Sequence, residues 1–323
     1  MCHQVYEANP PPRLPEPAAT PADVRQRLVD QARHGLSHYP RRSGPGPSGS
    51  RFEHWGTVCA DSVSLEAASE VIVMFLLGEC PEEALQANLG SRLLALRKPN
   101  GKIRPLACGS IIRRLAARAA CATFRDQLRL ACGPFQYGVG RRAGCEQVHK
   151  ALTALTAASP KDVVLSFDAK NAFNCMPRLR ILQAVASRVP GLLGPVTQLI
   201  GRPTTHLFWG SGGSARGIRA SCGVDQGCPL SPALFALGLA DALSDIDRRL
   251  RGLAPSSRTF AYLDDVMVFV PAEHSVAAVA IVREELTKAG LEMNVDKTAA
   301  WTLDPAAPLP LPCTVSASLP CGA

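Results

Sequence analysis

The chain has 323 residues, of which 46% are hydrophobic, and its formal net charge is +8. This length suits one large domain or two modest ones, and the hydrophobic content is ample for a core, so fibrous and wholly disordered proteins are excluded. The longest apolar run, residues 71–77, is far shorter than the roughly 20 residues that a membrane span requires, which excludes a transmembrane protein.

Residues 1–60 are rich in Pro, Gly and Ser, as in "NPPPRLPEPAATPAD" and "RRSGPGPSGSR". Such a composition buries little apolar surface, so we predict a largely disordered tail with one short helical stretch near 24–34. Order is expected to begin near Asp61, and a helical pattern follows over 65–77.

The segment 97–150 carries twelve Lys and Arg residues against two acidic residues, so the positive charge of the chain is concentrated there. Such a segment is typical of a protein that binds a polyphosphate or a nucleic acid, although a solvated basic helix face has the same composition. Within it, 94–97 and 102–107 are predicted strands joined by a turn at "PNG", which brings Lys98 and Arg104 close together.

Two adjacent carboxylates, Asp264 and Asp265, interrupt the otherwise apolar run "FAYLDDVMVF", which we interpret as a hairpin of two short strands. Like charges side by side raise each other's pKa, so the pair is either a solvated turn or part of a site for a divalent cation. A third carboxylate, Asp168, ends a predicted buried strand over 163–167. It would complete a cation site if the two strands are neighbours in one sheet.

The loop "VDQGCPLSP" precedes a predicted helix, and Gln226 and Gly227 stand where the backbone can approach a ligand closely. An amphipathic helix is predicted over 275–289, followed by a strand that ends near Lys297. From residue 304 onward the sequence shows no pattern of a packed element.

Six segments in this order resemble the fingers and palm of a reverse transcriptase of the non-LTR retrotransposon and group II intron type. They are "GKIRPLA", "QYGVGRRAG", "LSFDAKNAFN", "VDQGCPLSP", "YLDD" and "GLEMNVDKT", and they span about 93–298. One such segment is weak evidence, whereas six in the family's order are specific. The resemblance implies an α+β right-hand polymerase fold, with an antiparallel palm sheet backed by helices and no recognisable thumb.

Composition and pattern together with the resemblance divide the chain into four expected regions. These are a largely disordered Pro/Gly-rich tail (1–60), a basic fingers region (61–150), a palm with the catalytic carboxylates (151–302) and an unpatterned C-terminal tail (303–323).

Individual residues acquire expected roles from the same resemblance. Asp168, Asp264 and Asp265 match the metal-binding catalytic carboxylates, and Lys297 is similar to a lysine that protonates the pyrophosphate leaving group. Phe173 matches the bulky ring that selects deoxynucleotides by blocking a 2′-hydroxyl, although without the resemblance an ordinary core position is the favoured interpretation. The remaining matches are Lys98 and Arg104 for the incoming triphosphate, the carbonyl of Ala169 as an additional metal ligand, and Gln226 and Gly227 for the nucleotide and template.

The function expected from the resemblance is that of an RNA-directed DNA polymerase domain of a retroelement. This nucleotidyltransferase adds deoxynucleotides to a primer 3′-hydroxyl by two-metal phosphoryl transfer, with two Mg²⁺ ions, or Mn²⁺ in their place. The expected partners are an RNA template, a DNA primer and deoxynucleoside triphosphates, and no membrane. The twelve scattered cysteines and the lack of a recognisable signal peptide indicate reduced thiols in an intracellular protein, with the nucleus as a candidate compartment for a retroelement.

Two other functions fit part of the pattern. An RNA-directed RNA polymerase shares the palm, but that family typically carries Gly-Asp-Asp at the hairpin and an acidic residue at the position of Phe173. A catalytically silent, nucleic-acid-binding remnant of a retroelement would keep the fold. The lack of a recognisable thumb favours this second alternative, because phosphate contacts supply much of the affinity for a primer and template.

Overall fold

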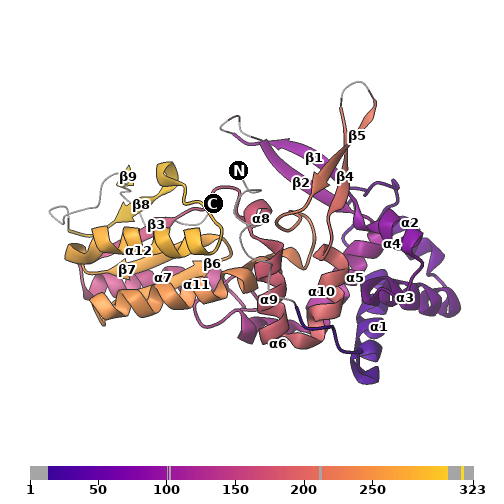
Figure 1. The fold of residues 1–323 in the computed structure, drawn as a ribbon, viewed down its shortest axis with the longest axis horizontal. Coiled ribbons are helices and arrows are strands. Elements are labelled where there is room, and N and C mark those ends of the chain that lie inside the picture. The colour runs from indigo at the N-terminus through magenta and orange to yellow at the C-terminus, as the bar shows by residue number, and fades with distance from the viewer. Residues whose placement is uncertain (1–13, 100, 102, 211–212, 305–313, 316–323) are drawn as a thin grey trace. The chain divides into compact units, whose positions relative to one another are not determined.

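The structure is a computed structural model that describes residues 14–99, 101, 103–210, 213–304 and 314–315 (Figure 1). The chain forms two compact units. Unit 1 comprises Met1–Arg125 and Arg178–Leu234, and unit 2 comprises Asp126–Pro177 and Phe235–Ala323. Each unit contains helices and its own sheet, and most strand pairs are antiparallel, which confirms the α+β class. The units interleave along the chain, whereas the expected fingers and palm follow one another.

Unit 1 begins with a helical cluster in which α1, α3 and α5 pack on one another (Figure 1). Helix α3 starts at the N-cap Asp61, whose carboxylate accepts a hydrogen bond from the Ser64 amide, and it ends at Gly78 with a positive φ. The helices of this unit are α1 (Ala22–Ser37), α2 (Phe52–Val58), α3 (Ser62–Leu77), α4 (Glu82–Leu89), α5 (Ile111–Thr123), α9 (Arg178–Arg188), η1 (Pro190–Leu192) and α10 (Leu193–Ile200).

The N-terminal segment differs from the expected disordered tail. Helix α1 has 16 residues and buries Leu28, Val29, Ala32 and Leu36 against the neighbouring helices, and α2 also precedes Asp61. These apolar residues recur at helical spacing and form one face of α1 that packs on its neighbours. The Pro-rich composition of the flanking residues gives no sign of this face. Residues 1–13 of the expected tail lie outside the described residues.

The sheet of unit 1 has the strand order β2-β1-β4-β5. Strand β1 (Ser91–Arg97) is antiparallel to β2 (Ile103–Gly109) and parallel to β4 (Thr204–Trp209), and β4 is antiparallel to β5 (Ala215–Ala220). The sequences of these four strands contain five arginines and no acidic residue. Two of these arginines, Arg97 and Arg104, belong to the basic segment 97–150, and the other three lie outside it.

The sheet of unit 2 has the strand order β6-β7-β3-β8-β9. All neighbouring strands are antiparallel except β8 and β9. The strands are β3 (Val163–Phe167), β6 (Arg258–Tyr262), β7 (Asp265–Val270), β8 (Ala299–Trp301) and β9 (Thr314–Val315). The helices are α6 (Arg125–Ala131), α7 (Gly144–Ala158), α8 (Ala172–Cys175), α11 (Ser231–Leu253), η2 (Ala272–His274), α12 (Ser275–Lys288) and η3 (Val295–Lys297); the first residue of α6 and the first turn of α11 belong to unit 1.

Both faces of the central strand β3 are buried. On one face Val164 packs with Phe260 and Phe269 of the neighbouring strands and with Val148 and Leu152 of α7. The alternate β3 side chains are also buried, and α12 contacts both β3 and β7. Burial on both faces explains why four of the five residues of β3 are apolar.

The C-terminal part differs in detail from the expected pattern. The segment at Lys297 is the 3-10 helix η3, and the strand expected to end there is β8, which begins at Ala299. Of the expected unpatterned tail, Thr314–Val315 forms β9, while 305–313 and 316–323 lie outside the described residues. Among the described residues, no helix combines the length and the apolar character that a membrane crossing demands.

Candidate active site

Three carboxylates lie at one end of the unit 2 sheet. Phe167 of β3 pairs with Val266 of β7, so Asp168, which follows β3, is next to Asp265, which begins β7. Tyr262 pairs with Asp265 across the β6–β7 hairpin, which leaves Leu263 and Asp264 as its two turn residues. The two strands are therefore neighbours, as the interpretation of a three-carboxylate site requires.

The pKa of Asp265 reflects its burial and the proximity of the other two carboxylates. Burial raises the pKa of Asp265, and the negative charges of Asp264 and Asp168 raise it further, to about 6, although Lys297 opposes the shift. The carboxylates therefore interact unfavourably with one another when all are ionised.

Asp168 is already engaged by two side chains. Its Oδ1 lies 2.9 Å from Nζ of Lys297 and its Oδ2 accepts a hydrogen bond of 2.9 Å from Nδ2 of Asn294. The Asp168 backbone carbonyl also accepts from the Asn294 amide at 2.8 Å. This pairing with the segment before η3 places the Lys297 ammonium beside the carboxylate that the sequence analysis interprets as a metal ligand.

The donor set fits a hard divalent cation. Carboxylate oxygens are the ligands that Mg²⁺ prefers, and a cation would offset the burial and the repulsion that together raise the pKa of Asp265. Within the described residues, however, no three His, Cys, Asp or Glu side chains are spaced to hold a metal ion as they stand. In this arrangement Asp168 is paired with Lys297, whose ammonium would compete with a cation for its Oδ1.

Ala169 and Phe173 follow Asp168 in unit 2. Ala169 is buried and forms an isolated antiparallel bridge with Met293. The ring of Phe173 is half-buried and stacks on the fully buried Phe235, with 4.7 Å between the ring centroids. Phe173 is thus supported from the core while part of its ring stays accessible.

The other predicted site residues belong to unit 1. Lys98 is half-buried just after β1, and Arg104 is exposed on β2. The Ala107 amide of β2 donates a hydrogen bond of 2.7 Å to the Gln226 carbonyl. Gly227 has φ +125°, and a Cβ on it would lie 2.5 Å from the Ala107 carbonyl oxygen, so only glycine fits. The loop of Gln226 and Gly227 is therefore held against the strand that bears Arg104.

The residue before Gln226, Asp225, joins a buried polar network that the sequence analysis did not identify. Its Oδ2 accepts from the Ser91 hydroxyl at 2.9 Å and lies 3.0 Å from a guanidinium nitrogen of Arg113, and Nε2 of His206 donates to its Oδ1 at 2.9 Å. The Ser91 amide donates to Nδ1 of His206 at 3.0 Å, so both ring nitrogens of His206 are engaged within the network.

The network strongly favours the ionised form of Asp225. Burial opposes ionisation, but Arg113, His206 and Ser91 outweigh it and hold the pKa of Asp225 well below its ordinary value. These residues are separated by up to 134 positions in the sequence, so no local spacing marks them as a group.

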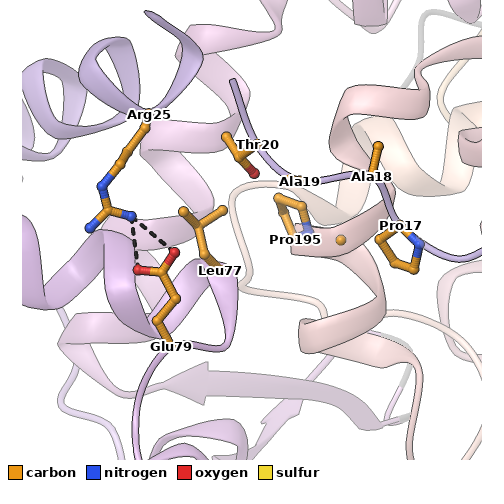
Figure 2. A pocket seen from close by; sticks show the side chains of 9 residues that line it. Pro17, Ala18, Ala19, Thr20, Arg25, Leu77, Glu79 and Pro195 are labelled. Atoms are coloured by element: carbon orange, nitrogen blue, oxygen red, sulfur yellow. Dashed lines mark hydrogen bonds and ion pairs between the residues drawn. The ribbon is translucent and has the colours of Figure 1, made fainter. Parts of the chain in front are cut away.

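A cavity of about 320 Å³ in unit 1 contains none of the predicted site residues (Figure 2). Arg25 lies at its wall and forms an ion pair of 2.8 Å with Glu79, which Figure 2 draws beside Leu77 and Thr20. Because Arg25 also pairs with Glu70 at 3.0 Å, its charge is fully compensated within the protein.

The chain is similar in sequence to a protein of a retrotransposable element. The Retrotransposable element SLACS 132 kDa protein of Trypanosoma brucei gambiense is 28% identical over 302 residues, which cover 91% of this chain and 24% of that protein. The chain thus spans about a quarter of the length of this relative.

Two solved structures of Candida tropicalis telomerase are also similar. The complex with a TWJ fragment of telomeric RNA matches with a TM-score of 0.51 and 12% identity, over 68% of this chain and 42% of that one. The apo enzyme truncated from its C-terminal domain matches with a TM-score of 0.46 and 10% identity, over 66% and 50%. At this identity the first likeness concerns the fold alone.

The family model described as "Reverse transcriptase (RNA-dependent DNA polymerase)" matches residues 96–314. This match covers more than half of the chain and includes the three carboxylates, the Gln226–Gly227 loop and Arg104. The chain therefore belongs to the reverse transcriptase family, whose members are RNA-dependent DNA polymerases and thus nucleotidyltransferases.

Proposed function

We propose that the chain is the reverse transcriptase domain of a retrotransposon protein and extends a DNA primer on an RNA template. The observation that carries this proposal is the convergence of Asp168, Asp264 and Asp265 at one end of the unit 2 sheet, with the pKa of Asp265 raised to about 6. The similarity to a retrotransposable element protein supports the assignment to a retroelement.

The sheet of unit 2 with α7 and α12 serves as the palm, and the basic sheet of unit 1 serves as the fingers. The palm assignment is supported by the carboxylates on the β6–β7 hairpin and at the end of β3. The fingers assignment is supported by the five arginines of the β2-β1-β4-β5 sheet, since a triphosphate or a nucleic acid requires positive charge.

In the proposed reaction Asp168, Asp264 and Asp265 would hold the catalytic cations, with the Ala169 carbonyl as an additional ligand. Two bound Mg²⁺ ions, or Mn²⁺ in their place, would lower the pKa of the primer 3′-hydroxyl and stabilise the charge on the triphosphate during in-line displacement. Lys297, with about half of its side chain exposed, can leave Asp168 and donate a proton to the departing pyrophosphate.

The nucleotide is held by the remaining residues. Lys98 and Arg104 bind its phosphates, and the Gln226–Gly227 loop lines the nucleotide and template, which its fixed position on β2 supports. Phe173 excludes ribonucleotides. Its stacking on the buried Phe235 supports this role, because a ring held from beneath is a rigid barrier to a 2′-hydroxyl.

Primer extension on a homopolymeric RNA template, with Mg²⁺ or Mn²⁺, tests the proposal. The purified chain should incorporate deoxynucleotides, and its Asp264→Asn variant should incorporate none while keeping its circular dichroism spectrum and its affinity for primer–template. Extension by Asp264→Asn would contradict the metal-binding role. No extension by a folded wild-type chain that still binds primer–template would replace the polymerase proposal with that of a catalytically silent remnant. Preferential incorporation of ribonucleotides would instead favour an RNA-directed RNA polymerase.

A further inference from the structure

The turn that carries Asp264 has an unusual backbone. Leu263 has φ +55°, one of four such non-glycine residues among those that the structure describes. In the two-residue β6–β7 turn, Leu263 is the first central residue, and a positive φ there belongs to the type II′ pattern, which favours glycine. A leucine in this conformation needs support from its surroundings.

One buried side chain provides that support. Gln136, whose exposed fraction is 1%, accepts a hydrogen bond of 2.8 Å at Oε1 from the Leu263 amide. Its Nε2 donates a bond of 3.1 Å to the Leu263 carbonyl. A single amide side chain therefore satisfies both backbone polar groups of the strained turn residue.

The segment that bears Gln136 is itself fixed to the hairpin. The Tyr137 amide donates to the Ala261 carbonyl at 2.7 Å, and the Ala261 amide donates to the Phe135 carbonyl at 2.8 Å. Gln136 and Ala261 thus form a parallel bridge beside β6. The Gly138 amide donates to Oε1 of Gln136 at 2.9 Å, which orients the side-chain amide toward the turn.

Gly138 allows the close approach of the two segments. A Cβ on Gly138 would lie 2.8 Å from the Leu263 side chain and 2.9 Å from the Leu263 amide nitrogen, which is closer than real Cβ contacts. Its φ is not among the positive values, so alanine would not strain the backbone here, and the nearest clash of its Cβ would be with Leu263.

From these contacts we infer that Gln136 is a positioning residue, which holds Leu263 at positive φ and thereby aims the neighbouring Asp264 at the catalytic site. The inference rests on the proposed function, since it assumes that Asp264 binds a catalytic cation. A change of φ at Leu263 would rotate the Asp264 backbone that follows it. Gln136 would act on the rate of the chemical step rather than on nucleotide binding, because its side chain contacts the hairpin turn.

The first test uses Gln136→Met, which keeps the length of the side chain but removes its hydrogen bonds. We expect kcat for primer extension to fall by about 10- to 100-fold, as for a catalytic group displaced by roughly 1 Å, with less than about a twofold change in KM for the deoxynucleotide. Gln147→Met is the matched control, because Gln147 is exposed in the same unit and its side chain bonds only the Arg142 carbonyl at 2.8 Å among the contacts described.

The second test is rescue by Leu263→Gly in the Gln136→Met background. Glycine reaches positive φ without the penalty that leucine bears, a penalty that changes a conformational population by about 5- to 30-fold. We therefore expect the double variant to regain about that factor in kcat. A purely structural role of Gln136 would not be rescued by a change at Leu263. Wild-type kcat in Gln136→Met, or no gain in the double variant, overturns the inference.

Hydrogen exchange gives a readout that does not depend on activity. The Leu263 amide should exchange at least about tenfold faster in Gln136→Met, since it loses its buried acceptor. This measurement also separates the inference from the proposed function, because it applies even if the wild-type chain extends no primer. Unchanged protection of the Leu263 amide from hydrogen exchange would contradict the inferred role of Gln136 directly. If Gln136→Met does not fold, Gly138→Ala should produce the same loss of kcat through the contact with Leu263.

Discussion

The carboxylate of Asp225 lies 3.0 Å from the guanidinium of Arg113, and both side chains are almost completely buried, with exposed fractions of 8% and 3%. Arg113 belongs to the first turn of α5, and Asp225 precedes the Gln226–Gly227 loop, so the pair ties the loop to this helix. Arg178 holds the same loop from another side, because its Nε donates to the Gly223 carbonyl at 2.9 Å.

Replacement of Asp225 by asparagine should therefore destabilise unit 1. Asparagine retains the shape of the side chain but leaves the Arg113 charge buried and uncompensated, which typically costs about 3–5 kcal/mol of unfolding free energy. Urea denaturation measures this loss. The control is Asp23→Asn, because Asp23 forms an exposed pair of 3.4 Å with Arg27 in the same unit, and such pairs contribute about 0–1 kcal/mol. Equal losses in the two variants would contradict the prediction.

The same network predicts a loss of stability in acid. The pKa of Asp225 in the folded protein lies well below its ordinary value of 3.8, so the unfolded chain binds the proton more readily. The stability that Asp225 contributes is complete above pH 3.8 and is lost as the pH falls through the folded-state pKa. Unfolding free energies measured from pH 5 down to pH 2 should fall more steeply for the wild type than for Asp225→Asn. Parallel pH profiles would argue against this assignment.

The contribution of Asp265 to stability depends on pH in the opposite direction to that of Asp225. Its pKa is raised to about 6, so the folded metal-free protein binds the proton more tightly than the unfolded chain, and stability falls as the pH rises from about 4 to 6. Mg²⁺ should compensate for this loss at neutral pH. At ten times its dissociation constant, an ion that binds only the folded state adds about 1.4 kcal/mol.

Thermal unfolding with and without Mg²⁺ at pH 7 checks this prediction. The melting temperature of the wild type should rise on addition of Mg²⁺, while that of Asp265→Asn should already be higher without the ion and should respond less. The same response to Mg²⁺ in both proteins would show that the ion binds elsewhere.

The carboxylates of the candidate site stand out in the sequence more than the side chains around them do. Asp264 and Asp265 interrupt an apolar run and Asp168 ends one, whereas the grouping of all three as a metal site came from the resemblance. The register of β3 and β7 then places Asp168 next to Asp265.

Gln136 and Asp225 lie within two of the matching segments, "QYGVGRRAG" and "VDQGCPLSP", and neither had a predicted role. Leu263 is 127 positions from Gln136 and Ser91 is 134 positions from Asp225, and no local period encodes such distances.

Helix α1 was underestimated for a related reason. The Pro and Gly composition around it dominates any average over residues 1–60, whereas the helix is stabilised by the fit of Leu28, Val29 and Leu36 against α3 and α5. Tertiary packing of this kind overrides local composition.

Phe173→Ala should admit ribonucleotides if the ring excludes the 2′-hydroxyl. Removal of the ring leaves Phe235 beneath it uncovered and opens space at the sugar, so incorporation of ribonucleotides should rise relative to deoxynucleotides. The measurement is the ratio of kcat/KM for a matched pair of nucleotides, which compares the two transition states directly. An unchanged ratio in a folded, active variant would assign Phe173 to the core.

Lys297→Met distinguishes two proposed roles of Lys297, as the ion-pair partner of Asp168 and as the proton donor to pyrophosphate. Its ammonium lies 2.9 Å from Oδ1 of Asp168 and competes there with a cation, so its removal should tighten Mn²⁺ binding by about two- to fivefold, as expected for a half-exposed ion pair. The same substitution should lower kcat by about 100-fold or more if Lys297 protonates the leaving pyrophosphate.

Lys170→Met is the control, because Lys170 is about equally exposed in the same unit and pairs instead with Glu292 at 2.5 Å. Electron paramagnetic resonance of bound Mn²⁺ gives the affinity, and single-turnover extension gives the rate. Tighter binding with an unchanged rate would leave Lys297 as a counter-charge to Asp168 and exclude it as the general acid.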